Sequence, residues 1–195
     1  MTVQTNPRIN QGTLFLVVGP SGAGKDSVIA GARKTLSGDE RFAFARRTIT
    51  RPAAAGGEDH IETTPAEFSI QQAAGAFCLY WQAHGLHYGI SRSCGDDIAT
   101  RRCVFANVSR SVIHTARRRF PRVRVINVTA PPDVLAERLA SRGRESIDDI
   151  RLRLKRASED IPGGPDVITL QNAGPLEHSV RIFVSILQLC AFETV

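Results

Sequence analysis

A short glycine-rich segment holds the residues whose types and spacing are best suited to chemistry. It follows an apolar run, 14–18, and reads Gly19, Pro20, Ser21, Gly22, Ala23, Gly24, Lys25, Asp26, Ser27. This G-x-x-x-x-G-K spacing is typical of loops whose backbone amides surround phosphate oxygens, and the lysine adds a positive charge for the outer phosphates. We predict that residues 19–27 bind a nucleoside triphosphate. A plain glycine-rich turn between a strand and a helix is the alternative.

Asp26 departs from the usual pattern, which has Ser or Thr at this place to put a hydroxyl group on Mg²⁺. Magnesium prefers oxygen ligands and often takes only one or two carboxylates beside water and phosphate. A carboxylate close to phosphates is favourable when a metal ion lies between them. We therefore expect Asp26, or its neighbour Ser27, to be a Mg²⁺ ligand. The alternative is that Asp26 is simply an acidic residue favoured in a first helical turn.

The composition indicates a single soluble domain that acts on a small anion. The chain has 195 residues, of which 42% are hydrophobic, and a formal net charge of +6. Its arginines occur in short separate groups without interleaved aromatic residues, which by itself discriminates only weakly; together with the glycine-rich loop it favours a small, highly charged substrate over nucleic acid. No apolar run approaches the length of about 18 residues that a membrane span needs. We expect no nucleic-acid partner and no membrane partner.

Residues 1–11 are polar, so we expect a mobile tail followed by one domain, 12–195. The four cysteines show no metal-ligand spacing, which favours reduced thiols and a cytoplasmic location. The sequence leaves the oligomeric state open, a dimer included.

Apolar periodicity predicts strands that alternate with helices. The expected strands are 14–18, 42–50, 77–83, 103–108, 123–128 and 166–170, and the expected helices are 25–37, 64–75, 109–118, 132–141, 146–160 and 176–189. Thr64, Pro65 and Glu67 form a capping-box signature at one helix start. The alternation predicts an α/β fold with a parallel central sheet and helices on both faces.

Four motifs occur in a recognisable order over nearly the whole chain. They are Gly19-Pro20-Ser21-Gly22-x-Gly24-Lys25, Thr48-Ile49-Thr50-Arg51, Gly85-x-x-Tyr88-Gly89 and Arg138-Leu139-x-x-Arg142-Gly143. In these motifs the chain resembles the guanylate-kinase-type nucleoside monophosphate kinases. The resemblance implies a P-loop NTPase three-layer sandwich, an acceptor-binding subdomain at about 41–91 and an arginine-bearing lid at about 138–156.

Several positions differ from that family. Guanylate kinases bind guanine through a glutamate and a serine, and this chain has Leu79 and Arg47 in those places. Leu79 cannot accept a hydrogen bond, and an unmet polar edge in a closed pocket costs about 1 to 3 kcal/mol. The family's acidic residues near Asn107 are replaced by Ala106 and Val108, which suggests that the metal-binding charge has moved to the glycine-rich loop.

The Gly-Lys-Asp-Ser ending of the loop is accompanied by Trp81-x-Ala83-His84-Gly85-Leu86-x-Tyr88-Gly89 and Arg142-Gly143-Arg144-Glu145. In these motifs the chain closely resembles the ribose 1,5-bisphosphate phosphokinases, over about residues 14–190. The resemblance implies a phosphotransferase that uses ATP and Mg²⁺ to convert ribose 1,5-bisphosphate to 5-phosphoribosyl 1-diphosphate in phosphonate degradation.

The resemblances and the chemistry of such a transfer together assign roles to single residues. The expected catalytic residues are Lys25, Arg138, Arg142 and Arg153. For the acceptor we choose Arg47 and Arg51 as phosphate ligands and Tyr88 as a hydroxyl donor, with His60 as a further candidate. Asn172 is expected to contact the adenine of ATP, beside the loop 19–27. Two other hypotheses remain open: a guanylate kinase with altered base contacts, and a guanylate-kinase-like binding module without catalysis.

Overall fold

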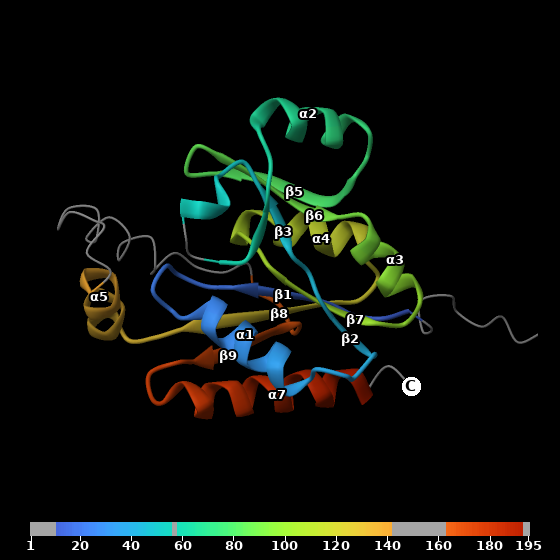
Figure 1. The fold of residues 1–195 in the computed structure, drawn as a ribbon. Coiled ribbons are helices and arrows are strands. Elements are labelled where there is room, and N and C mark those ends of the chain that lie inside the picture. The colour runs from blue at the N-terminus through green and yellow to red at the C-terminus, as the bar shows by residue number, and fades with distance from the viewer. Residues whose placement is uncertain (1–10, 56–57, 142–162, 193–195) are drawn as a thin grey trace, which may run out of the picture.

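The computed structural model describes residues 11–55, 58–141 and 163–192 (Figure 1). In chain order the described elements are β1 (Leu14–Val18), α1 (Lys25–Thr35), β2 (Phe42–Phe44), β3 (Arg47–Ile49), η1 (Ala53–Ala55), β4 (His60–Glu62), α2 (Pro65–Ala73), β5 (Phe77–Ala83), β6 (Leu86–Ser91), α3 (Ser93–Ala99), β7 (Cys103–Asn107), η2 (Arg110–Val112), α4 (Ile113–Arg119), β8 (Val123–Thr129), α5 (Pro132–Ala140), β9 (Val167–Gln171) and α7 (Leu176–Phe192). In this part of the chain no helix is both long and apolar enough to cross a lipid bilayer.

The central sheet is parallel throughout, with the strand order β2-β7-β1-β8-β9. Its middle strand β1 is fully buried because helices cover both faces. Phe15 and Val17 point into a core formed with α1 and α7, while Leu14, Leu16 and Val18 point into a second core formed with α3 and α4. The predicted α/β fold with a covered parallel sheet is thereby confirmed.

A second sheet of four strands, in the order β4-β3-β6-β5, lies beside the central one. Its hairpin β5-β6 turns at His84 and Gly85, which both have positive φ, as a two-residue turn matched to the strand twist requires. Leu79, Trp81 and Ile90 of this sheet pack into the same core as Leu14 of β1. The small sheet is therefore held against the central sheet by a shared apolar core.

The predicted strand 42–50 is wrong as a single element. Phe42 to Phe44 form β2 in the central sheet, and Arg47 to Ile49 form β3 in the small sheet. After β2 the Ala45 amide still donates to the Phe105 carbonyl of β7, and the chain then leaves that sheet. Alternating apolar residues predict an extended backbone, but they do not say which sheet a strand joins.

The capping box at Thr64 is confirmed, since its hydroxyl accepts from the Glu67 amide and the Glu67 carboxylate accepts from the Thr64 amide. The short elements α3 and β4 were missed, because three to seven residues carry little periodicity. The predicted helix 146–160 lies outside the described residues.

Candidate active site

The glycine-rich loop runs from the end of β1 to the start of α1, where its geometry excludes larger residues. Gly19 has φ +142°, and a Cβ atom there would overlap the Val128 carbonyl of β8. Gly24 has φ +82°, and a Cβ atom there would overlap the Asn172 amide. The loop thus lies tightly against the ends of β8 and β9, with the first amides of α1 directed to its interior.

Lys25 is half-buried at the first position of α1 and turns back onto this loop. Its Nζ atom donates to the carbonyls of Gly19 and Pro20, over 2.8 Å each. The ammonium group therefore lies beside the backbone that would surround a phosphate, where a point charge acts most strongly.

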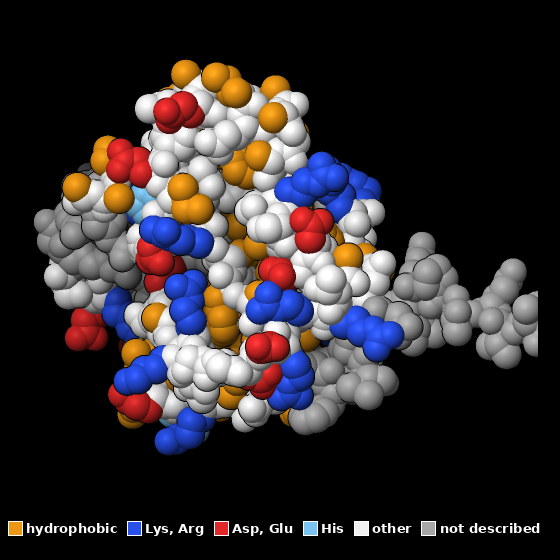
Figure 2. Space-filling model, turned by 45° about the vertical axis from the view of Figure 1, so that its right-hand side comes forward, with side chains coloured by type: hydrophobic (Ala, Val, Ile, Leu, Met, Phe, Trp, Pro, Cys, Tyr) orange, Lys and Arg blue, Asp and Glu red, His pale blue; other side chains and the backbone are white. Residues whose placement is uncertain are grey.

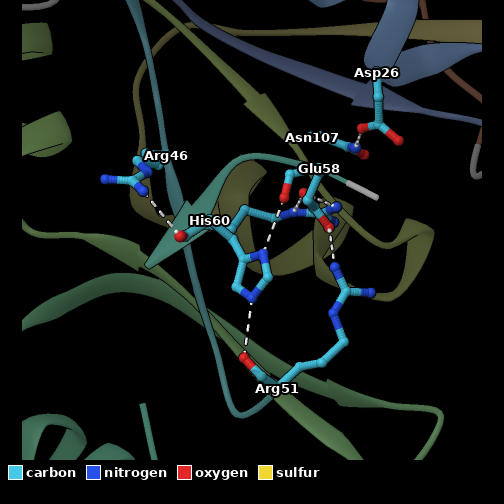
Figure 3. A network of polar contacts seen from close by, with 7 residues as sticks. Asp26, Arg46, Arg51, Glu58, His60 and Asn107 are labelled. Atoms are coloured by element: carbon cyan, nitrogen blue, oxygen red, sulfur yellow. Dashed lines mark hydrogen bonds and ion pairs between the residues drawn. The ribbon is translucent and has the colours of Figure 1, made fainter. Parts of the chain in front are cut away.

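Asp26 and Asn107 lie together, although 81 positions separate them in the chain. Asn107 is the last residue of β7, and its Nδ2 atom donates to Asp26 Oδ1 over 2.6 Å (Figure 3). Among the described residues no group of three or more His, Cys, Asp or Glu side chains gathers as a metal site. A single oriented carboxylate with the exposed Ser27 nearby is still compatible with Mg²⁺, which takes its remaining ligands from water and phosphate.

Asn172, at the end of β9, is buried beneath the loop. Its side-chain Nδ2 atom donates to the Ala23 backbone carbonyl over 2.8 Å, and its backbone carbonyl accepts from Arg138 Nη1 over 3.0 Å. Asn172 and Arg138 therefore both lie at the loop, and their predicted roles toward ATP stay predictions. Arg142 and Arg153 lie outside the described residues.

The predicted acceptor residues Arg47, Arg51 and Tyr88 gather on the small sheet. The Arg47 guanidinium lies 5.5 Å from the centre of the Tyr88 ring, and that ring stacks on Trp81 at 5.2 Å with an interplanar angle of 5°. Burial raises the pKa of the Tyr88 phenol above its usual value, while Arg47 and Arg51 partly oppose this shift. The hydroxyl group therefore stays protonated at neutral pH and can donate a hydrogen bond.

Glu58 was missed from the sequence. Arg47 Nε donates to Glu58 Oε2 over 2.6 Å, and Arg47 Nη2 pairs with the same oxygen. Arg51 Nη2 lies 3.9 Å from Glu58 Oε1 (Figure 3). The side chains of Arg47 and Glu58 are only 12% and 15% exposed. The sequence does show an acidic residue close to Arg47 and Arg51, which were assigned to phosphate. Glu58 itself belongs to none of the motifs.

His60 is 3% exposed and directs both ring nitrogens to backbone carbonyls. Nδ1 lies 3.0 Å from the Glu58 carbonyl, and Nε2 lies 3.0 Å from the Arg51 carbonyl (Figure 3). With both nitrogens engaged, His60 holds the two ends of the intervening loop. Its direct contact with the acceptor stays a prediction, which this geometry does not favour.

The fold and the loop define the class of the protein: it has the α/β fold of the P-loop NTPases. A solved structure of guanylate kinase from Anaplasma phagocytophilum is similar, with a TM-score of 0.63 and 20% identity, and the match covers 92% of this chain and 86% of that one. A gluconokinase from Sinorhizobium meliloti matches with a TM-score of 0.53 and 20% identity, over 94% of this chain and 95% of that one. These two likenesses show the shared fold.

Relatives of higher identity narrow the class. Ribose 1,5-bisphosphate phosphokinase PhnN of Brucella melitensis is 45% identical over 185 residues, 95% of this chain and 96% of that protein. The protein of the same name from Rhodopseudomonas palustris is 48% identical over 177 residues, 90% of this chain and 89% of that protein. The chain belongs to the ribose 1,5-bisphosphate phosphokinase family, which confirms the resemblance drawn from the motifs.

A bifunctional ribose 1,5-bisphosphokinase-thymidine phosphorylase from Cupriavidus pinatubonensis is 49% identical over 177 residues. That match covers 91% of this chain but only 29% of the bifunctional protein, so the chain spans less than a third of that relative. No family model matches the chain.

Proposed function

We propose that the protein transfers the γ-phosphoryl group of ATP to ribose 1,5-bisphosphate and forms 5-phosphoribosyl 1-diphosphate, a step of phosphonate degradation. The observation that carries this proposal is Arg47. It lies beside Arg51 on the acceptor side of a P-loop, at the position where guanylate kinases have a serine for their base. The 45% identity to the Brucella melitensis phosphokinase supports the same acceptor.

The transfer needs no general base, because the attacking atom is an oxygen of the acceptor's 1-phosphate and is already anionic. The bond between the γ-phosphorus and the β,γ-bridging oxygen breaks, a bond from the 1-phosphate oxygen to that phosphorus forms, and ADP leaves. Catalysis then consists of alignment and neutralisation of charge. Lys25 and Arg138 lie beside the loop and supply two of the cations, and we assign Arg142 and Arg153 to the same task.

The loop fits ATP. Its glycines let the backbone pass close to Val128 and Asn172 in conformations that a Cβ atom would block, and the first turn of α1 directs backbone amides toward the phosphates. In the described part of the chain, Asn172 Oδ1 is buried and has no hydrogen-bond partner. We assign it to the adenine amino group, since a buried acceptor without a donor is costly. Asp26, with Ser27, would hold Mg²⁺, which supplies further positive charge on the phosphates.

On the acceptor side, Arg47 and Arg51 would bind phosphate, and the Tyr88 hydroxyl would donate a hydrogen bond. We propose that the small sheet, with its surrounding residues 41–91, is the acceptor-binding part of one kinase domain. We propose ATP and a phosphosugar as the small-molecule partners and the cytoplasm as the location. The oligomeric state is left open, a dimer included. Figure 2 shows one face of the molecule, on which the Lys and Arg side chains form several separate groups.

The two other hypotheses are weaker. A guanylate kinase needs a hydrogen-bond acceptor for guanine, but Leu79 is fully buried in the core and offers none. A binding module without catalysis has no need of a lysine and an arginine beside the phosphate loop, and this chain has Lys25 and Arg138 there.

The proposal is tested by ADP release from ATP and Mg²⁺ with ribose 1,5-bisphosphate, for the full chain and for Lys25→Ala. Lys34→Ala is the matched control, because Lys34 is exposed at the far end of the same helix. We expect turnover by the wild-type protein and Lys34→Ala and none by a folded Lys25→Ala. A folded Lys25→Ala that keeps its activity would contradict the role of the loop.

A further inference from the structure

A carboxylate lies between the two arginines that bind the acceptor phosphate in the proposed function. Glu58 Oε2 accepts from Arg47 Nε and pairs with Nη2, while Oε1 lies 3.9 Å from Arg51 Nη2. The Glu58 and Arg47 side chains are nearly buried, at 15% and 12% exposure, and Arg51 is 28% exposed. This contact is thus shielded from water, where an ion pair orients its partners more firmly than at the surface.

Two guanidinium groups held close together repel each other, and the repulsion grows as water is excluded. One carboxylate shared by both groups offsets that repulsion and fixes the orientation of the Arg47 guanidinium group. It leaves a net charge of +1 on the three groups, so an anionic ligand is still attracted. The cluster is therefore assembled before a phosphate arrives, which lowers the cost of binding it.

The backbone that carries Glu58 is itself fixed. His60, on the neighbouring strand β4, contacts the carbonyls of Glu58 and Arg51 over 3.0 Å each and so ties the two ends of the loop. On the opposite side the Arg47 guanidinium lies over the Tyr88 ring, which stacks on Trp81. Glu58 and the ring together leave Arg47 little freedom to move.

We propose that Glu58 is the positioning residue of the acceptor site: it holds Arg47 and Arg51 together in the geometry that receives the acceptor phosphate. This inference rests on the proposed function, which gives the two arginines their ligand. Glu58 acts through the arginines, takes no proton and forms no bond during the transfer. Its effect falls on binding of the acceptor and not on binding of ATP.

The test compares Glu58→Gln with Glu62→Gln in steady-state kinetics with ATP and ribose 1,5-bisphosphate. Glu62 is the matched control because it is an exposed acid two residues beyond His60 that contacts the Ala53 amide and, within the described residues, no arginine. We expect Glu58→Gln to raise the KM for the acceptor roughly tenfold or more, the loss typical of a hydrogen-bonded charge pair. The KM for ATP should stay within about twofold of the wild-type value, and Glu62→Gln should match the wild type. An unchanged or lowered KM for the acceptor overturns the proposal.

Two further measurements separate positioning from a general loss of structure and from failure of the proposed function. Glu58→Asp keeps the carboxylate, so its KM for the acceptor should lie between those of the wild type and Glu58→Gln. Modification by phenylglyoxal, followed by peptide mass spectrometry, needs no activity. Arg47 should react faster in Glu58→Gln than in the wild type, while Arg46, which is 51% exposed, reacts equally in both. Equal protection of Arg47 in the two proteins overturns the proposal even if ribose 1,5-bisphosphate is not the acceptor.

Discussion

Asn107 donates a 2.6 Å hydrogen bond to Asp26 and joins the end of β7 to the first turn of α1. Asn107 lies at the end of β7 between two buried residues, Ala106 and Val108. In guanylate kinases the positions of Ala106 and Val108 hold acidic residues. The carboxylate is thus supplied by the helix, and the strand supplies an amide that orients it. This arrangement accounts for an aspartate at a loop position that usually holds Ser or Thr.

The first prediction follows from this pair. Asn107→Ala should raise the Mg²⁺ concentration for half-maximal turnover by about tenfold, the lower range for loss of a residue that orients a metal ligand. Asp26→Asn should raise it further, and the double variant should equal Asp26→Asn alone, since Asn107 acts only through Asp26. Titration of Mg²⁺ at saturating ATP measures all three. Effects of the two substitutions that simply add would show that the residues act independently.

The second prediction concerns the contact between the loop and β8. Gly19→Ala places a Cβ atom on the Val128 carbonyl and should lower the free energy of unfolding, or displace the loop and abolish ATP binding. Gly38→Ala is the control for backbone strain, because Gly38 has φ +93° with no atom within 4 Å of the added Cβ. Its cost should be about 1 to 2 kcal/mol, with ATP affinity unchanged. Urea denaturation and ATP titration test both variants, and equal behaviour of the two would show that the loop is not packed against Val128.

The third prediction concerns pH. Burial raises the pKa of the Cys78 thiol to about 11 and that of Cys94 to about 12, from an ordinary value of 9.0. Between pH 9 and 11 the folded protein keeps protons that the unfolded chain loses, so the free energy of unfolding should fall as the pH rises. Urea midpoints measured at pH 8 and pH 10 test this sign, and Cys94→Ala should flatten the decrease. At pH 8, iodoacetamide should modify both thiols far more slowly in the folded protein than in urea; equal rates would contradict their burial.

The sequence predicts those parts of the site whose chemistry is local. The loop 19–27 and the capping box at Thr64 each depend on a few adjacent residues, so spacing alone identifies them. The break of the strand after Ala45 depends on which sheet each half joins, and the contacts that decide this come from β7 and β6, many residues away.

The ion pairs of the proposed acceptor site could not be predicted from the sequence for the same reason. Glu58 contacts Arg47, eleven positions earlier, only because β3 and β4 pair side by side. His60 is expected to contact the acceptor, which stays a prediction; its buried ring directs both nitrogens to backbone carbonyls, a placement that its residue type does not reveal. A residue type suggests what a side chain could bind, whereas the neighbours that the fold supplies determine what it does bind.

The most direct test of the account offers the protein ribose 1,5-bisphosphate and GMP together, at equal concentration, with ATP and Mg²⁺. Products are identified by mass spectrometry, and Arg47→Ser, which restores the serine found in guanylate kinases, is assayed in parallel. The account predicts 5-phosphoribosyl 1-diphosphate and ADP as the wild-type products, with no GDP from the added GMP, and a large loss of that activity in Arg47→Ser. Formation of GDP in preference to 5-phosphoribosyl 1-diphosphate would contradict it, because the acceptor site would then recognise a base that neither Leu79 nor Arg47 can accommodate.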